Sequence, residues 1–261
     1  MAEAGEVGEV EEESRRPFYT RGEKRFSAPS RNMNPALLAA VVVALLLLAL
    51  APWTAAGGPR YRIPELPFRR LGDDDYWVYE VPQFLTDEEC DMVLREAEAK
   101  GFKESNVYSG PGQETSDLAT RRSENTWLPA AESHIDRLIS TTVAHVTGLP
   151  VDHMEALQVI RYPTGGYFKP HFDPGSDGEI VDRALTVLIY LNDDFEGGGT
   201  TFPEIGVTVR PERGKAVLFW SLDDQGRILP KALHGGDPVT CGTKLACNKW
   251  VHTGPFRGSL G

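Results

Sequence analysis

The sequence predicts a mainly β domain of the α+β class, with a double-stranded β-helix (jelly-roll) core flanked by helices and an N-terminal transmembrane helix. From Glu155 onward, short apolar and β-branched runs alternate with Gly, Pro and Asp turns, a spacing typical of a sandwich or barrel. Two segments before this region repeat apolar residues at helical intervals. An uncharged apolar run from Ala36 to Trp53 precedes both.

The apolar run has no charged residue between Arg31 and Arg60. A membrane-spanning helix needs ~20 apolar residues, with a range of ~17–25. A surface helix of a globular domain would show one polar face. An uncleaved signal anchor, a cleaved signal peptide and a buried helix are the three interpretations. About 35 polar residues come first, whereas signal peptides place the apolar region within the first ~15–30 residues, so we favour the anchor.

Basic residues are slightly more numerous before the run than after it, which favours a cytosolic N-terminal side. We therefore expect a single-pass type II protein of the endoplasmic reticulum membrane, with the Golgi as the alternative and the globular domain in the lumen. The predicted organisation is a disordered cytosolic tail (1–34), a transmembrane signal anchor (35–56), a linker (57–75) and a globular domain (76–257).

Composition fits one globular domain after a tether. The chain has 261 residues, of which 41% are hydrophobic, and a formal net charge of −11 without a basic stripe. This charge argues against a nucleic-acid partner. The three cysteines lack the Cys-x-x-Cys spacing of a zinc site. Cys241 and Cys247 are the nearest pair for a disulfide, whereas Cys90 is expected to be a buried thiol.

Two helices are expected before the β region. The capping box Thr86–Glu89 begins the first, and Gly101 ends it. Apolar residues recur at helical spacing between Ala130 and Val146, which predicts the second. The polar segment from Phe102 to Leu128 is predicted to be a loop and a candidate lid.

A metal site is suggested by His171, Asp173, His234 and Lys244. His171 and Asp173 are two residues apart in a strand-like segment, so both side chains project to one side. His234 can reach them from a distant strand. Two histidines and one carboxylate form the facial triad that binds Fe(II) and leaves positions open. Lys244 could bind the far carboxylate of a chelating co-substrate. Together they predict an enzyme that uses iron, O2 and a 2-oxo acid.

The His-x-Asp spacing alone is common, but here its surroundings form a specific set. From about Tyr76 to Phe256 the chain resembles the catalytic domain of the prolyl 4-hydroxylases, which are Fe(II)- and 2-oxoglutarate-dependent dioxygenases. The similarity is to the single-chain plant and algal type with an N-terminal anchor. The matching segments are Leu157–Tyr162, Tyr167–Asp173, Leu188–Leu191, Glu196–Thr200, Ala216–Ser221, Leu233–Gly236 and Asn248–His252.

The resemblance implies a role for each matching residue. His171, Asp173 and His234 would bind iron and, with Lys244, form the catalytic set. Lys244 and Tyr162 would bind the distal carboxylate of 2-oxoglutarate, and Thr186 would assist them. Four further residues would lie near the peptide groove or the wall of the active site: Glu155, Arg183, Trp250 and His252. Ordinary core packing is the alternative for Thr186 and Trp250.

The implied reaction is 4-hydroxylation of peptidyl proline in secreted proteins, of the procollagen-proline 4-dioxygenase type. Fe(II), 2-oxoglutarate, O2 and L-ascorbate are the implied cofactors and co-substrates, and succinate and CO2 the by-products. A proline-rich peptide or protein would be the substrate, without an obligate partner subunit. The short segment from Pro174 to Asp182 departs from many relatives and leaves the peptide specificity open.

Three alternatives remain. The same enzyme class could hydroxylate lysine or another residue of secreted peptides. A zinc hydrolase could use the same ligands, although Tyr162 and Lys244 would then have no task. A membrane-tethered jelly roll that only binds its partner is the third, and the intact set of His171, Asp173, His234 and Lys244 argues against it.

Overall fold

The computed structural model describes residues 68–73, 75–108, 114–115, 117–174 and 182–256, all within one compact unit, Tyr61–Gly261. The predicted tail and anchor and most of the linker lie outside these residues. Within the described part of the chain, no helix has the length and apolar character needed to cross a membrane.

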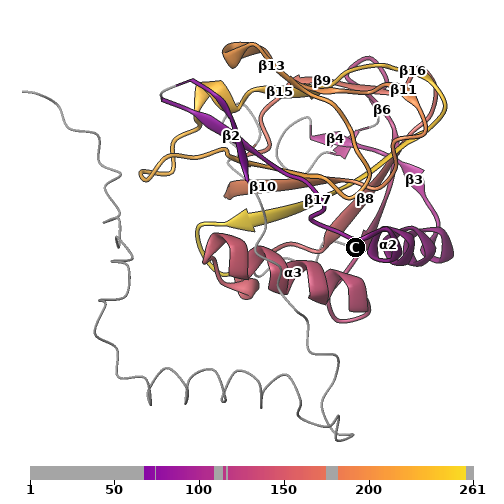
Figure 1. The fold of residues 1–261 in the computed structure, drawn as a ribbon, viewed down its shortest axis with the longest axis horizontal. Coiled ribbons are helices and arrows are strands. Elements are labelled where there is room, and N and C mark those ends of the chain that lie inside the picture. The colour runs from indigo at the N-terminus through magenta and orange to yellow at the C-terminus, as the bar shows by residue number, and fades with distance from the viewer. Residues whose placement is uncertain (1–67, 74, 109–113, 116, 175–181, 257–261) are drawn as a thin grey trace, which may run out of the picture. The chain divides into compact units, whose positions relative to one another are not determined.

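The domain is built in three layers (Figure 1). Its central layer is an eight-stranded antiparallel sheet in the order β1-β2-β14-β10-β17-β8-β7-β3. These strands are β1 (Arg69–Gly72), β2 (Trp77–Val81), β14 (Ala216–Trp220), β10 (Arg183–Tyr190), β17 (Lys244–His252), β8 (Leu157–Tyr162), β7 (Glu124–Leu128) and β3 (Lys103–Glu104).

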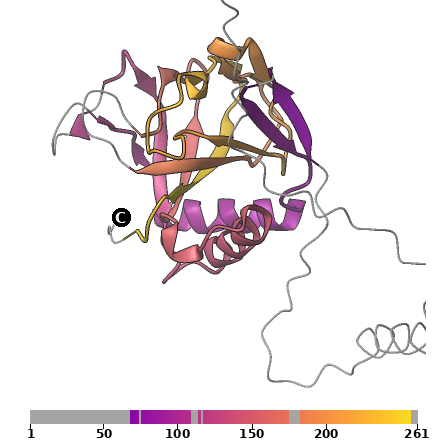
Figure 2. The same ribbon diagram turned by 90° about the vertical axis from the view of Figure 1, so that its left-hand side faces the viewer.

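A five-stranded antiparallel sheet covers one face of the central sheet (Figure 2). In its order, the strands are β13 (Val207–Val209), β12 (Thr200–Phe202), β15 (His234–Gly236), β9 (Tyr167–His171) and β6 (Arg121–Arg122). Two small pairs complete the strands: β11 (Glu196–Gly197) with β16 (Val239–Cys241), and β4 (Val107–Tyr108) with β5 (Glu114–Thr115). This pair of facing sheets agrees with the predicted jelly roll.

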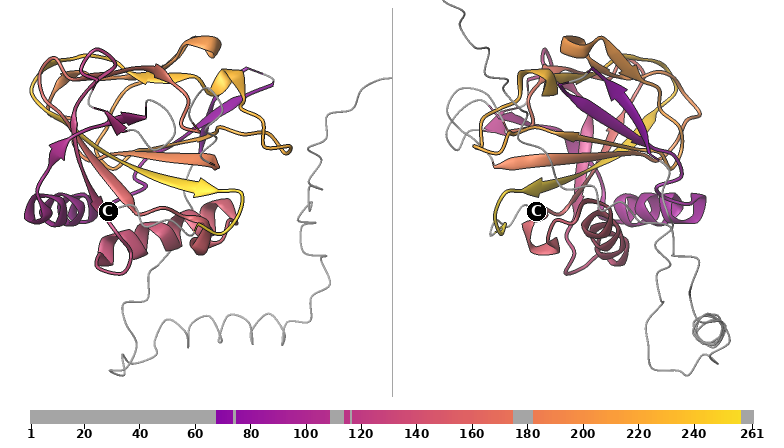
Figure 3. Two further views of the ribbon diagram at one scale, coloured as in Figure 1. Left: turned by 180° about the vertical axis from the view of Figure 1, so that it is seen from behind. Right: turned by 60° about the vertical axis from the view of Figure 1, so that its left-hand side comes forward.

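Helices α2 (Asp87–Lys100) and α3 (His134–Thr147) cover the other face of the central sheet (Figure 3). Short 3-10 turns η1 (Val151–His153), η2 (Pro203–Ile205) and η3 (Pro230–Ala232) connect strands. The capping box is confirmed: the Thr86 hydroxyl accepts from the Glu89 amide, and the Glu89 carboxylate accepts from the Thr86 amide. Gly101 ends α2 with φ of 82°.

Strand β10 explains how one sheet serves two cores. Leu185, Val187 and Ile189 pack with the helices. Leu188 and Tyr190 alternate with them and pack toward the second sheet. Because successive strand residues face opposite sides, an almost continuous apolar strand is what a sheet covered on both faces requires. The face toward the second sheet is the one that carries the site.

Helix α3 begins later than the apolar pattern indicates. Pro129 accepts backbone hydrogen bonds from Glu132 and Ser133, which makes a turn there. The Ser133 hydroxyl then accepts from the Asp136 amide and caps the helix. A serine cap satisfies an otherwise unpaired amide of the first turn, so the helix starts at His134.

Two sequence-based expectations need correction. Arg69–Gly72 of the predicted linker pairs with β2 as an edge strand, which the exposed, polar segment does not reveal. The predicted loop 102–128 contains β7 of the central sheet. The sequence leaves open whether Cys241 and Cys247 form a disulfide; in the structure all three cysteines are free, with Cys90 and Cys247 buried and Cys241 exposed on β16. Cys90 is the buried thiol that was predicted.

Candidate metal and co-substrate site

The structure brings the three predicted metal ligands together between the two sheets. His171 ends β9, and its strand partner across the ladder is His234, at the start of β15. Asp173 follows His171 by two residues and is buried. One ligating atom from each of the three residues lies within 4.8 Å of the other two. The pairing of β9 with β15 brings the two histidines together, and the turn that follows β9 brings Asp173 to them.

The two imidazoles are oriented by backbone carbonyls. His171 Nδ1 donates to the Lys169 carbonyl over 2.9 Å, and His234 Nδ1 donates to the Ala232 carbonyl over 3.0 Å. A neutral imidazole that donates through Nδ1 carries its lone pair on Nε2. These Nε2 atoms lie 3.7 Å and 3.8 Å from the two oxygens of Asp173, too far for a hydrogen bond. The three donors thus surround a space that suits a cation.

Burial and neighbouring groups shift the pKa values of His234 and Asp173 toward the protonation states that bind a metal. Desolvation lowers the pKa of His234 to about 4, so this imidazole is neutral at pH 7. Burial opposes ionisation of Asp173, but His234, His171 and the Thr186 hydroxyl hold the pKa of its carboxyl well below the usual range. A metal ion needs a neutral imidazole and an ionised carboxylate as ligands. The donor chemistry fits Fe(II), which accepts this 2-His-1-carboxylate set.

Aromatic rings fix the histidine side chains. Phe168 stacks on His171 with the ring centroids 3.6 Å apart. Phe202 and Phe219 lie 5.6 Å and 4.6 Å from the His234 ring. Because packed rings leave few alternative rotamers, the ligand geometry is set before a metal arrives.

Thr186 differs from its expected role. Its hydroxyl donates to Asp173 Oδ2 over 2.5 Å, so this hydroxyl is engaged by the ligand carboxylate and not presented to a co-substrate. Thr186 is 1% exposed and lies opposite Trp250 in the ladder between β10 and β17. We assign Thr186 to the orientation of the metal ligand, in the way that outer hydrogen-bond partners orient ligands at other metal sites.

Lys244 is a buried cation inside the barrel. It pairs in register with Tyr162 on β8, and its ammonium lies 5.4 Å and 5.3 Å from the Tyr162 and Tyr190 rings. Its hydrogen bond within the described residues goes to the Gly198 carbonyl over 2.6 Å. Burial lowers the pKa of Lys244 to about 8, although Asp237 opposes the shift. A buried ammonium with donors to spare suits an anionic ligand.

Gly198 makes room for this lysine. Its φ is +65°, and a Cβ atom there would lie 2.8 Å from the Phe195 ring and 3.1 Å from Lys244 Cδ. A side chain at this position would therefore strain the backbone and push on the lysine. Gly198, in the glycine run Gly197–Gly199, therefore leaves space for the side chain of Lys244.

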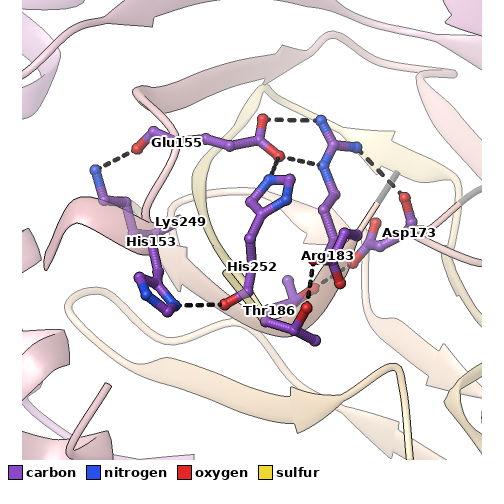
Figure 4. A network of polar contacts seen from close by, with 9 residues as sticks. His153, Glu155, Asp173, Arg183, Thr186, Lys249 and His252 are labelled. Carbon is purple, nitrogen blue, oxygen red and sulfur yellow. Dashed lines mark hydrogen bonds and ion pairs between the residues drawn. The ribbon is translucent and has the colours of Figure 1, made fainter. Parts of the chain in front are cut away.

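The four residues predicted for the peptide side form one cluster, and Figure 4 shows Glu155, Arg183 and His252 of it. Glu155 is fully buried and accepts two hydrogen bonds from Arg183, of 2.6 Å and 2.9 Å, and one from His252 Nε2, of 2.7 Å. Arg183 lies flat over the Trp250 ring at 3.7 Å and donates to the Asp173 carbonyl over 3.4 Å. The cluster is therefore connected directly to the metal ligand.

The Glu155 carboxylate and the Arg183 guanidinium form a buried pair of opposite charges. Burial opposes ionisation of Glu155, but hydrogen bonds from His252 and Arg183 hold its pKa below the ordinary value. The carboxylate is thus ionised at pH 7 and locks the Arg183 guanidinium in a two-pronged contact, the geometry in which arginine binds carboxylates most strongly.

Arg121 is a candidate binding residue that the sequence does not indicate. This residue on β6 is 6% exposed, lies over the Phe168 ring at 4.7 Å and donates to the Ser123 hydroxyl over 2.8 Å. Its Nη2 atom is buried and has no hydrogen-bond partner among the described residues. Burial lowers the pKa of Arg121, which nearby Tyr162 and Asp173 oppose. A guanidinium with an unused buried donor beside Tyr162 offers a binding group to a ligand. Arg121 and Ser123 are buried on either side of the exposed Arg122, a strand alternation that the residue types Arg-Arg-Ser do not reveal.

We expect Thr186→Val, which removes the hydroxyl and keeps the side-chain volume, to weaken metal binding about 10–100-fold, because the Asp173 carboxylate loses its orienting donor. Thr186→Ser keeps the hydroxyl and is the matched control. Anaerobic titration with Fe(II), followed by calorimetry, measures both. Equal affinities for Thr186→Val and the unaltered protein would show that the hydrogen bond does not orient the ligand.

Comparison with known proteins agrees with this geometry. The model of the 2OG-Fe(II) oxygenase superfamily matches residues 157–252, the stretch that contains all three metal ligands and Lys244. A probable prolyl 4-hydroxylase 3 of Arabidopsis thaliana is 34% identical over 197 residues, which cover 67% of this chain and 68% of that protein. A probable prolyl 4-hydroxylase 10 of the same plant is 30% identical over 286 residues, covering 93% and 99%.

A solved structure shares the fold. The viral collagen prolyl hydroxylase of Paramecium bursaria Chlorella virus 1, in complex with 2OG, aligns with a TM-score of 0.56 and 26% identity, over 69% of this chain and 97% of that one. The identity and coverage of these relatives, together with the assembled ligands, lead to one conclusion. The chain belongs to the prolyl 4-hydroxylase family of 2OG-Fe(II) oxygenases.

Proposed function

We propose that this protein is a 2-oxoglutarate-dependent dioxygenase that hydroxylates peptidyl proline at C4, with release of succinate and CO2. The observation that carries the proposal is the convergence of two imidazole Nε2 atoms and one carboxylate between the sheets. Family membership supports the same reaction. Bound Fe(II) and 2-oxoglutarate would supply the oxidising power that inserts one oxygen atom of O2 into an unactivated C–H bond.

The residues of the chain divide the remaining work. His171, Asp173 and His234 would hold the iron from one side, which leaves the other side for the co-substrate and O2. Lys244 would bind the distal carboxylate of 2-oxoglutarate in a charge-assisted hydrogen bond, and Tyr162, its ladder partner, would donate to the same group. The buried lysine and its ring neighbours would also exclude water from the bound co-substrate.

The peptide would bind beside Asp173, against the cluster of Glu155, Arg183, Trp250 and His252. Arg183 supports this assignment because its guanidinium is fixed by Glu155, contacts the backbone of a metal ligand and keeps a side-chain exposure of 17%. A fixed guanidinium can donate to a peptide carbonyl and so set which ring carbon approaches the metal. Positioning of this kind is a main contribution of the protein in cofactor enzymes.

The cellular setting is part of the proposal. A signal anchor at 35–56, a type II orientation and a lumenal domain in the endoplasmic reticulum would place the enzyme with secreted proline-rich chains. L-ascorbate would serve as the reductant, and the enzyme would act without a partner subunit. The uncharged run from Ala36 to Trp53 supports the anchor.

Extraction of membranes with alkaline carbonate tests the anchor. We expect the full chain to stay in the membrane pellet and a variant without residues 35–56 to be released. Release of both proteins would contradict the anchor.

The affinity for 2-oxoglutarate should depend on pH through Lys244. The pKa of this lysine is lowered to about 8, so the ammonium is charged below pH 8 and loses its charge as the pH rises above it. Because the distal carboxylate needs the charged form, binding takes up one proton above pH 8. We expect the dissociation constant to rise about tenfold per pH unit there. Equilibrium titration between pH 6.5 and 9.5 measures it.

Two variants test the assignment of this pH dependence. Lys244→Met should weaken 2-oxoglutarate binding at pH 7 and abolish the rise above pH 8. Lys215→Met removes another buried ammonium, one paired with Glu80 and Glu212 away from the metal ligands, and should leave the profile unchanged. A rise that persists in Lys244→Met would assign the titration to another group.

The reaction itself is tested with the purified protein, Fe(II), 2-oxoglutarate, ascorbate and a proline-rich peptide. We expect succinate release that the peptide stimulates, and a mass gain of about 16 Da on proline from the single inserted oxygen atom. Both signals should be lost in His171→Ala, which removes a metal ligand, and persist in His145→Ala, which alters an exposed residue of α3.

The other outcomes separate the alternatives. Turnover of 2-oxoglutarate with oxidation of lysine would keep the dioxygenase and replace the substrate residue. Succinate release that no peptide stimulates would contradict prolyl hydroxylation. Peptide hydrolysis with Zn(II) and without 2-oxoglutarate would contradict the oxygenase reaction altogether.

A further inference from the structure

A second buried ion pair lies directly behind the Glu155 cluster. Lys249 on β17 and Asp136 on α3 are 1% and 0% exposed, and Lys249 Nζ donates to Asp136 Oδ1 over 2.5 Å. The same ammonium donates to the backbone carbonyl of Glu155, also over 2.5 Å (Figure 4). One cation thus joins the helix layer to the residue that holds Arg183 and His252.

The Lys249–Asp136 pair lies on the face of the central sheet opposite to the candidate site. Trp250 and Lys249 are neighbours on β17, so they face opposite sides of the central sheet. Trp250 faces the second sheet and packs under Arg183. Lys249 points toward α3, into the apolar layer between sheet and helices. The Lys249 ammonium therefore cannot reach a ligand in the site, and it contacts the Glu155 backbone instead.

Stability alone is a weak reason for this pair. Burial raises the pKa of Asp136 and lowers that of Lys249, so desolvation disfavours both charges. Asp136 Oδ2 is buried without a hydrogen-bond partner among the described residues. Replacing a buried ion pair by apolar side chains of similar size is often neutral or stabilising. What apolar side chains could not replace is the hydrogen bond to the Glu155 carbonyl.

We propose that Lys249, held by Asp136, is a positioning residue for peptide binding: it fixes the backbone of Glu155, and Glu155 in turn fixes Arg183 and His252. The inference rests on the proposed function for its peptide substrate. The chain of contacts runs from Asp136 through Lys249, Glu155 and Arg183 to the carbonyl of Asp173. In this series of contacts, neither the Lys249 nor the Asp136 side chain touches a metal ligand or Lys244. Metal binding and 2-oxoglutarate binding should therefore not depend on Lys249 or Asp136.

The test replaces both partners, because removing Lys249 alone would leave a buried carboxylate unpaired. In Lys249→Met/Asp136→Leu the apolar layer is kept and the contact with Glu155 is lost. The matched control is Lys215→Met/Glu80→Leu, which removes a buried pair between β14 and β2. Asp136→Asn, which keeps Lys249 on the Glu155 carbonyl, is a milder second variant.

Two readouts are measured. With synthetic decaproline as the peptide, we expect the KM of the double variant to rise about tenfold or more, since small misplacements of positioning groups have effects of this order. The kcat and the 2-oxoglutarate affinity should stay within about twofold of the parent protein, because Thr186 still holds the Asp173 carboxylate and Lys244 lies outside the cluster. Asp136→Asn should give an intermediate KM, and the control pair the parent value.

The second readout needs no peptide. In the Zn(II)-loaded protein, nitrogen NMR of labelled histidine reports the His252 ring, whose Nε2 donates to Glu155. We expect this Nε2–H signal to shift and to exchange faster with water in the double variant. An unchanged His252 signal together with an unchanged peptide KM would overturn the inference. A shifted signal in a protein that neither binds nor hydroxylates decaproline would support the positioning role and contradict the proposed substrate.

Discussion

The ionised carboxylate of Asp173, buried between two sheets, is the constraint on which the site depends. Such a group is stable in an apolar interior only when cations and donors surround it. Thr186 donates to one oxygen, and Arg183 binds the carbonyl of the same residue. The Nε2 atoms of His171 and His234 lie 3.7 Å and 3.8 Å from the two oxygens, where a bound cation would join all three side chains. These partners lie on β9, β15 and β10, so the position of Asp173 ties these three strands to one another.

The two layers behind this carboxylate have different tasks. The second sheet delivers the histidines through the pairing of β9 with β15. The central sheet delivers Lys244 and Tyr162 from adjacent strands on one face, and the same strand β17 carries Lys249 on the opposite face. One nine-residue strand therefore carries the co-substrate candidate Lys244 at its start, Trp250 and His252 of the Glu155 cluster at its end, and Lys249 toward the helix layer between them. This use of both faces explains why β17 is almost entirely buried.

The metal ligands could be predicted from sequence because their chemistry is local. His171 and Asp173 are two residues apart, although Asp173 lies in the turn after β9 and not on the strand, and Thr86 and Gly101 mark the ends of α2 through contacts within a few residues. The edge strand Arg69–Gly72 escaped because an exposed strand has no apolar alternation. Thr186 was given a co-substrate role because the sequence does not show that Asp173 lies within reach of its hydroxyl. Arg121 and the Lys249–Asp136 pair depend on contacts between distant segments, which no spacing pattern reveals.

X-ray absorption at the iron edge of the anaerobic Fe(II)-loaded protein tests most directly whether His171, Asp173 and His234 bind the metal. We expect a spectrum with two imidazole ligands and oxygen ligands, which loses one imidazole in His234→Ala and keeps both in Asp173→Asn with weaker iron binding. Iron with the same number of imidazoles in His234→Ala as in the parent protein would show that the metal binds elsewhere and would contradict the site described here.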